Sequence, residues 1–232
     1  MYVTITNEAP KRAYPDDYFT VGNKREVKPF LKKVLEADVT LTNKFCSWAN
    51  NISALRTIKN HAKMLEVSCH GLPWFVLVLA WMWVTRNGEV QHVLINLLFG
   101  LVLDLIFVSF LKAGTRRRRP AENKKDAFMM VGADKFSFPS GHASRAMFLA
   151  LFFMYLWPIS VFVIPPLCAW ATSVAISRVL MRRHHILDVI CGLLLGFVTA
   201  FILNILWISA SWSRYIYSYI SDEVMEGASY DV

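Results

Sequence analysis

Three short stretches of the chain combine histidine, aspartate and basic side chains with strongly apolar flanking sequence. They run from Lys112 to Pro120, from Pro139 to His142 and from Ser177 to Asp188. Charge beside lipid is costly, so its concentration at the ends of apolar segments indicates that these side chains have a use. Imidazoles can move protons near neutral pH, and fixed cations can hold anions. The combination suggests phosphate chemistry at a membrane surface.

The first stretch reads KAGTRRRRP and supplies cations for an anion site. Lys112 lies about one helical turn before the arginine run, so its ammonium and an arginine guanidinium of that run can converge on one anion. The planar arginine fork binds two phosphoryl oxygens at once, and lysine adds a compact charge. Taken alone, the run is more typical of a juxtamembrane basic stripe that contacts lipid headgroups. Arg117 and Arg118 fit that second role.

The second stretch, Pro139 to His142, precedes an apolar segment and is suited to seat a phosphate. Ser140 offers a hydroxyl, and Gly141 lets the backbone approach an anion closely. The helix expected to follow presents free amide groups at its positive end. His142 can transfer a proton to a departing oxygen. The alternative is a simple turn with a helix cap.

The third stretch places Ser177 and Arg178 before His184 and Asp188. His184 and Asp188 are four residues apart, so on a helix they share a face, and the carboxylate can orient one imidazole nitrogen. The other nitrogen is then free to act as a nucleophile. His185 lies three residues from Asp188 and competes for this role. Asp188 could instead stabilise a helix amino terminus through the dipole.

Taken together, the three stretches match an ordered pattern of motifs, Lys-x6-Arg-Pro, Pro-Ser-Gly-His and Ser-Arg-x5-His-x3-Asp. This pattern resembles the type 2 phosphatidic acid phosphatase (PAP2) superfamily, and all three motifs match without a substitution. The longer strings over residues 116–121 and 134–143 look most like the animal polyisoprenoid diphosphate phosphatases, which include the presqualene diphosphate phosphatase.

The resemblance implies a metal-independent lipid phosphatase that uses no cofactor. It aligns His184 with a nucleophile that forms a phosphohistidine and Asp188 with the residue that orients it, and it leaves His185 without a role. His142 aligns with the general acid and base. The phosphate would be held by Lys112, Arg119, Ser140, Gly141 and Arg178. The expected substrate is a polyisoprenoid mono- or diphosphate, with phosphatidate, lysophosphatidate or a sphingoid phosphate as alternatives and an inactive membrane scaffold as a further one.

The elements that must position these residues are apolar helices. Of the 232 residues, 55% are hydrophobic and 18% are charged, and the mean hydropathy is +0.38, which is typical of an integral membrane protein. We expect about five spans of roughly 20 residues or fewer. They are 72–85, 93–111, 143–157, 159–177 and 186–208. Pro165 and Pro166 should kink the fourth span. The predicted fold is an all-α polytopic membrane bundle, which the resemblance specifies as PAP2/haloperoxidase-like.

The chain is expected to divide into three parts. Residues 1–66 are polar and basic and contain apolar positions at helical spacing, which predicts surface helices or an ordinary solvated tail. Residues 67–210 form the membrane-embedded phosphatase domain, and 211–232 form a short polar tail. The first 21 residues lack the apolar core of a secretory signal. Nearly all Lys and Arg fall on one face, so the amino terminus and the active site are predicted to be cytosolic.

The expected partners are a lipid phosphate substrate and anionic membrane lipids. The net charge of +8 could indicate nucleic acid, but the cations cluster beside apolar runs and no nucleic-acid module is present, so that class is excluded. The four cysteines are expected to be free thiols, and homo-oligomerisation is left open. The resemblance places the protein in the endoplasmic reticulum or nuclear envelope.

Two further features of the apolar segments are predicted to be structural. Asp104 is expected to pair with Asn96 or with a polar group on a neighbouring span. Gly192 and Gly196 are expected to serve helix packing within the monomer.

Overall fold

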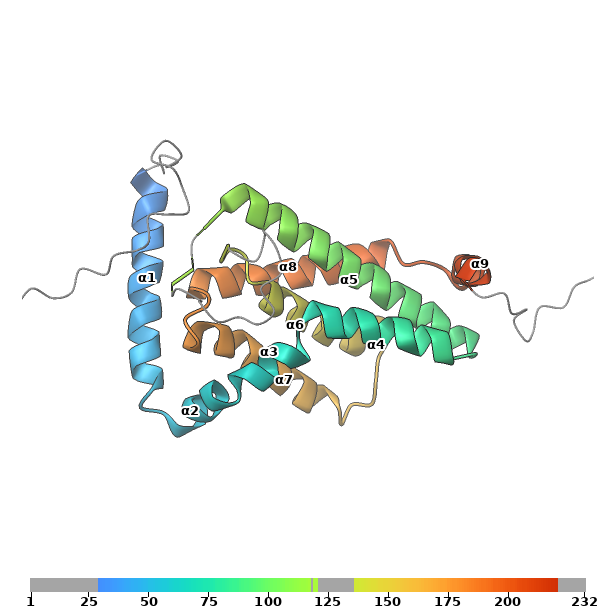
Figure 1. Ribbon diagram of the computed structural model, residues 1–232, viewed down its shortest axis with the longest axis horizontal. Helices are drawn as coiled ribbons and strands as arrows, with labels where there is room; N and C mark the ends of the chain where they lie inside the picture. Colours follow the sequence, from blue (N-terminus) through green and yellow to red (C-terminus); the bar gives the residue numbers. More distant parts are fainter. Residues whose placement is uncertain (1–28, 118, 121–135, 221–232) are drawn as a thin grey trace, which may run out of the picture. The chain divides into compact units, whose positions relative to one another are not determined.

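The computed structural model describes residues 29–117, 119–120 and 136–220, and these residues form helices without any strand (Figure 1). The chain divides into two compact units, 1–37 and 38–232, and the three motif stretches all belong to the second unit. The helices are α1 (Pro29–Ala49), α2 (Ser53–Asn60), α3 (Ala62–Ser68), α4 (Gly71–Val84), α5 (Gly88–Thr115), α6 (Gly141–Leu151), α7 (Ile164–Leu180), α8 (Ile186–Ile205) and α9 (Ala210–Ile220), and a π-helical turn at Phe152–Leu156 follows α6.

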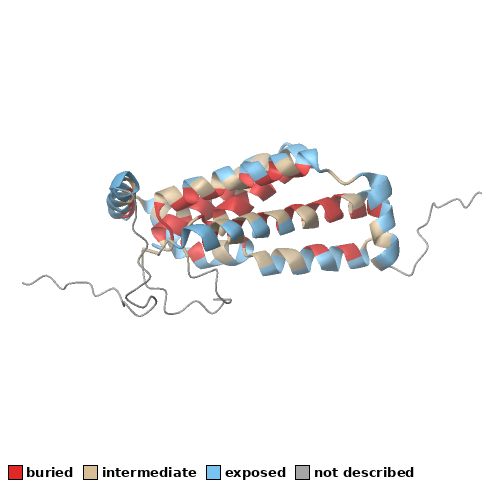
Figure 2. Cartoon of the chain, turned by 90° about the horizontal axis from the view of Figure 1, so that it is seen from above, coloured by how far each residue is buried: buried red, intermediate tan, exposed pale blue. Residues whose placement is uncertain are grey.

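The centre of the second unit is the packing of α6 against α8, with α5 and α7 on either side. Figure 2 shows buried residues gathered on the facing sides of these helices. Close approach depends on glycine: a Cβ at Gly192 would lie 2.5 Å from the Ser140 carbonyl oxygen, and one at Gly196 would overlap the Ser144 carbonyl oxygen. The prediction that this glycine pair serves packing within the monomer is confirmed.

Helix starts follow local capping chemistry. The Asn87 side chain accepts hydrogen bonds from the Glu89 and Val90 amides at 2.9 and 3.3 Å, so α5 begins at Gly88. The expected kink at Pro165 and Pro166 is wrong. Both prolines lie in the first turn of α7, where a missing N–H costs no helical hydrogen bond.

The all-α class is confirmed, and the number of spans stays a prediction. Among the described residues, α5 and α8 are long and apolar enough to cross a membrane. The pair α3 and α4, bent by 43°, would make a third span if it is counted as one, and α7 is a shorter apolar helix. The helix after Ser140 is interrupted by its π-helical turn and ends before Pro158.

The expected division of the chain into three parts also stays a prediction. The boundary at residue 66 falls inside α3, and the expected polar tail from residue 211 includes most of α9. Residues 1–28, Arg118, residues 121–135 and residues 221–232 lie outside the described residues. They include much of the basic amino-terminal region and part of the longer family-like string before Pro139.

The buried acid of α5, Asp104, pairs with α6. Its carboxylate accepts a hydrogen bond from the Ser144 hydroxyl and lies 3.4 Å from an Arg145 guanidinium nitrogen. Asn96 is not its partner, because the Asn96 amide binds the backbone of Ile208 and His92. Of the two expected partners for Asp104, the neighbouring helix is the correct one. The pair fixes α5 and α6, which carry two of the three motif stretches, against each other.

Candidate active site

Backbone and side-chain contacts bring the three motif stretches together at one end of the helices. The Ser137 amide donates to the Arg117 carbonyl at 2.8 Å, which joins the first stretch to the residues just before the second. The Ser140 amide donates to the Asp188 carbonyl at 2.9 Å, which joins the second to the third. An ion pair of 2.6 Å between Arg117 and Asp188 closes the set. The site is therefore built from the end of α5 and the starts of α6 and α8.

The start of α6 has the features of an anion seat. Ser140 is buried and caps the helix by accepting the Ala143 amide at 3.4 Å. The amides of Gly141 and His142 come at the first positions of the helix, where an α-helix has no carbonyl to pair them. The buried Nε2 of His142 has no hydrogen-bond partner among the described residues. The helix thus presents amide groups and one imidazole nitrogen at its positive end.

His184 lies in the loop between α7 and α8 and is buried. Its Nδ1 lies 2.7 Å from the Ser137 carbonyl oxygen, and its amide donates to the Arg178 carbonyl at 3.3 Å. A carbonyl can only accept, so Nδ1 carries the proton and Nε2 carries the lone pair. The network alone therefore selects one tautomer of this imidazole.

Burial lowers the pKa of His184 well below its ordinary value of 6.5. The positive charges of Arg119, Lys112 and Arg178 act in the same direction, and Asp188 opposes them. His184 is therefore neutral at neutral pH, with its lone pair available. All three cations therefore act on one imidazole, and their role in binding phosphate stays a prediction.

Asp188 contacts both histidines, and its shorter contact is with His185. Its Oδ2 lies 3.2 Å from Nδ1 of His185 and accepts the His185 amide at 2.8 Å, which forms a capping box at the start of α8. The same oxygen lies 3.9 Å from Nδ1 of His184, which is ion-pair range and beyond a hydrogen bond. In this structure the Ser137 carbonyl is the hydrogen-bond partner of His184.

Arg178 and Lys112 are buried cations of the site. Nη1 of Arg178 lies 3.5 Å from Oε1 of Glu66 on α3, and Nη2 donates to the Ala62 carbonyl at 3.3 Å. Glu66 also pairs with Arg183. Arg119 is partly buried; its neighbour Arg118 and residues 121–135 lie outside the described residues. The charge of Arg178 also acts on His142, so this guanidinium lies near both imidazoles.

Four residues at the site were not predicted from the sequence in these roles. Glu66 and Asp38 lie on helices before the motifs, Arg117 was interpreted as a headgroup contact, and Ser137 acts through its backbone. Asp38 had a signal: it shares a spacing of four residues with Thr42 and Cys46 along α1, and all three are buried. A backbone acceptor such as the Ser137 carbonyl leaves no signal in residue types.

The described residues contain no group of three or more His, Cys, Asp or Glu side chains arranged to hold a metal ion. All four cysteines are free thiols, as predicted.

Comparisons with known proteins identify the family of the chain. The chain matches the PAP2 superfamily over residues 93–212. The probable lipid phosphate phosphatase beta of Arabidopsis thaliana is 40% identical over 139 residues, which are 49% of this chain and 65% of that protein. The chain therefore spans slightly less than two thirds of the length of that relative.

Two solved structures share the fold. The crystal structure of Aquifex aeolicus LpxE has a TM-score of 0.51 and 21% identity, over 70% of this chain and 94% of that one. The crystal structure of the first transmembrane PAP2 type phosphatidylglycerolphosphate phosphatase from Bacillus subtilis has a TM-score of 0.51 and 24% identity, over 74% and 85%. Because the family match covers residues 93–212 of 232 and includes all three motifs, this chain belongs to the PAP2 superfamily.

Proposed function

We propose that the protein is a membrane lipid phosphatase that works through a phosphohistidine on His184. The observation that carries the proposal is the buried imidazole whose Nδ1 is bound 2.7 Å from a carbonyl, so that Nε2 holds the lone pair amid three cations. A neutral, oriented imidazole beside fixed positive charge is what in-line attack on phosphorus requires.

The proposed reaction has two steps. Nε2 of His184 attacks phosphorus, an N–P bond forms, and the P–O bond to the leaving group breaks as protonated His142 transfers its proton to the departing oxygen. Burial and nearby cations lower the pKa of His142, so the negative charge of the bound phosphate must raise this pKa again for His142 to carry the proton. Water then gives a proton back to His142 and attacks phosphorus, so that the N–P bond breaks and phosphate leaves. Throughout, the non-bridging oxygens are held by the side chains of Lys112, Arg119 and Arg178 and, at the start of α6, by the Ser140 hydroxyl and the Gly141 amide.

Asp188 is proposed to act at longer range. At 3.9 Å from Nδ1 of His184, its negative charge stabilises the imidazolium-like charge that develops when Nε2 bonds to phosphorus. Its carboxylate also holds the His185 amide and thereby the loop that carries the nucleophile. Fixed cations take the place of a metal ion in this proposal, so the reaction should proceed without one.

The proposed substrate is a polyisoprenoid mono- or diphosphate, such as farnesyl or presqualene diphosphate. Support comes from the longer strings around the first two motifs, which resemble the animal polyisoprenoid diphosphate phosphatases. A broader lipid phosphate specificity is the second candidate, because the Arabidopsis relative is named a lipid phosphate phosphatase. The site is proposed to open to the cytosol at the endoplasmic reticulum or nuclear envelope, which the cluster of Lys and Arg near the motifs supports.

The proposal is tested on purified full-length protein in detergent, with phosphate release measured in EDTA. We expect turnover in EDTA equal to that with magnesium, and acid-labile phosphate on the protein after rapid quenching. His184→Ala should lower kcat by about 1,000-fold or more and abolish the labelled phosphoprotein. The matched control is His61→Ala, because His61 is exposed and its ring Nδ1 lies 2.9 Å from the Thr57 carbonyl oxygen one turn earlier on the same segment.

Four substrates rank the specificity: farnesyl diphosphate, presqualene diphosphate, phosphatidate and sphingosine phosphate. We expect the highest kcat/KM for the two isoprenoid diphosphates. A His184→Ala enzyme as active as the parent would exclude the nucleophile assignment. A higher kcat/KM for phosphatidate would leave the mechanism in place and replace the isoprenoid assignment with the broader one.

A further inference from the structure

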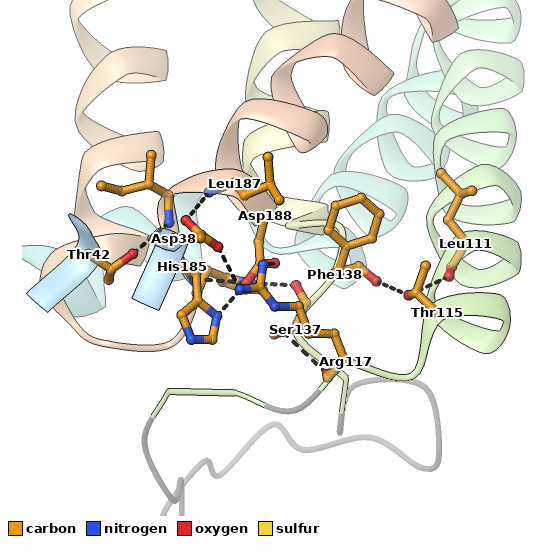
Figure 3. Close-up of polar contacts among 12 residues, drawn as sticks. Asp38, Thr42, Leu111, Thr115, Arg117, Ser137, Phe138, His185, Leu187 and Asp188 are labelled. Atoms are coloured by element: carbon orange, nitrogen blue, oxygen red, sulfur yellow. Dashed lines mark hydrogen bonds and ion pairs between the residues drawn. The ribbon is translucent and has the colours of Figure 1, made fainter. Parts of the chain in front are cut away.

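The start of α8, just after the proposed nucleophile, is capped by side chains from α1. The Thr42 hydroxyl accepts the Ile186 amide at 3.1 Å, and Oδ1 of Asp38 accepts the Leu187 amide at 3.0 Å (Figure 3). These are the first two amides of α8, which the helix itself leaves unpaired. A helix that precedes the family region by more than forty residues therefore caps the helix that follows the nucleophile loop.

Asp38 also begins a chain of charges that reaches Asp188. Its Oδ2 lies 2.6 Å from Nη2 of Arg117, and Nη1 of the same guanidinium lies 2.6 Å from Oδ1 of Asp188. Figure 3 shows the Arg117 side chain reaching between the two carboxylates. The side chains are 7%, 12% and 0% exposed, so water screens these contacts little. Arg117 thus bridges two acids that would otherwise repel each other.

This chain of charges ends on the backbone of the nucleophile loop. Oδ2 of Asp188 accepts the His185 amide at 2.8 Å, and the same carboxylate group lies near His184. Arg117 also accepts the Ser137 amide through its carbonyl, and the carbonyl of Ser137 in turn binds Nδ1 of His184. Arg117 therefore touches both groups that orient the imidazole. Its own position is set by Asp38.

We propose that Asp38 of α1 is a positioning residue for the nucleophile, acting through Arg117. This inference rests on the function proposed above for His184. The two carboxylate oxygens of Asp38 bind different groups: Oδ1 accepts the Leu187 amide at the start of α8, and Oδ2 pairs with the Arg117 guanidinium. Misplacement of a nucleophile by about 1 Å can cost roughly 100-fold in rate. Loss of Asp38 should therefore lower the rate of phosphoryl transfer with little effect on substrate binding.

The test uses the full-length protein and the variants Asp38→Asn, Asp38→Ala, Arg117→Ala and the double variant Asp38→Asn/Arg117→Ala. Asp38→Asn keeps an oxygen for the Leu187 amide and loses the charge that faces Arg117. We expect kcat and the rate of phosphohistidine formation to fall about 10- to 100-fold in each. KM and inhibition by orthovanadate should stay within about twofold of wild type, because the phosphate seat at α6 is untouched.

The double variant distinguishes a shared pathway from two independent defects. Asp38→Asn keeps the oxygen that caps α8 and loses only its effect on Arg117, so Asp38→Asn/Arg117→Ala should lose no more kcat than Arg117→Ala alone. The matched control is Glu36→Ala, which removes an exposed carboxylate from the same helix and should leave kcat unchanged. Thr42→Val removes one cap without altering the charge chain and should have a smaller effect than Asp38→Asn.

The possible results of these experiments distinguish failure of this inference from failure of the proposed function. Normal kcat in Asp38→Asn overturns the inference. So does a loss in which kcat, orthovanadate affinity and melting temperature fall together, since that pattern marks a general folding defect. If Asp38→Ala does not fold, Asp38→Asn still decides. A wild-type enzyme that turns over without any phosphohistidine contradicts the proposed function instead, and a selective kcat loss in Asp38→Asn would still show positioning of whatever reacts at this loop.

Discussion

The amino termini of α6 and α8 are joined by the hydrogen bond from the Ser140 amide to the Asp188 carbonyl, and they differ in how their first amides are capped. At α6 the Ser140 side chain caps the helix, and Gly141 and His142 follow it. Nε2 of His142 is buried and has no hydrogen-bond partner among the described residues. At α8 the first amides are bound by Thr42 and Asp38, and a capping box adds the Asp188 carboxylate. The two ends have the same backbone chemistry and different side-chain surroundings.

The difference suits the α6 end to phosphate binding and the α8 end to positioning. A helix amino terminus attracts anions only while its amides and dipole remain available. The α6 end keeps them available and is suited to bind phosphate. At the α8 end, the carboxylates of Asp38 and Asp188 already bind amides that could otherwise bind a phosphate. This end is therefore suited to fix the position of the proposed nucleophile loop. Binding and positioning are thus assigned to neighbouring helix ends, and each can be altered separately.

The largest expected effect comes from the α6 end. His142→Ala removes the proposed proton donor to the leaving oxygen, and we expect kcat to fall by about 100- to 10,000-fold. A substrate with a leaving group that needs no proton, such as p-nitrophenyl phosphate, should recover part of the loss. Equal losses for both substrates would contradict the acid role of His142.

A smaller effect is expected from the contact between the two helices. In Gly192→Ala, the new Cβ would lie 2.5 Å from the Ser140 carbonyl oxygen, which is too close, so the cap of α6 must shift. We expect about a 10-fold loss in kcat/KM and destabilisation of about 1–3 kcal/mol. Kinetics and thermal unfolding in detergent measure both.

Gly196→Ala is the control for that variant. It overlaps the Ser144 carbonyl one turn further from the site, so it should destabilise the protein comparably. Its kcat/KM, measured on the folded fraction, should fall less than that of Gly192→Ala. The opposite order would argue against Ser140 as part of the phosphate seat.

The smallest expected effect is in the pH dependence. Burial and three cations lower the pKa of His184, so its neutral, reactive form persists below pH 6.5 and is lost only as the pH falls through the lowered pKa. The acid limb of kcat/KM, corrected for the separately measured ionisation of the substrate, should therefore have its midpoint below 6.5. A midpoint at or above that value would contradict a buried neutral nucleophile.

Much of the fold and of the site could be predicted from the sequence, because both leave periodic or ordered signals. Apolar runs predicted the helices that became α5 and α8, and the Gly192–Gly196 spacing predicted the close packing of α8 against its neighbour. The three motifs predicted which residues meet, since they combine rare residue types at fixed separations. Even the wrong kink at Pro165 has a simple reason: the sequence shows that proline is present but not where the helix begins.

The remaining features depend on contacts between residues distant in the sequence. Asp38 is 149 residues from the Leu187 amide that it caps, and the Ser137 carbonyl is 47 residues from the His184 ring. Neither pairing leaves a local pattern. Spacing also could not decide between His184 and His185, because both lie within reach of Asp188 and only the folded loop gives them different partners.

The contact between α1 and α8 has a practical consequence for how this protein is dissected. Family similarity begins at residue 93, whereas Asp38, Thr42 and Glu66 all precede it. A fragment trimmed to the region of family similarity would retain every motif residue and lose the side chains that cap α8 after the proposed nucleophile loop. Expression designs should therefore start upstream of α1, and a naturally shortened isoform lacking that helix would be expected to bind phosphate esters far better than it cleaves them.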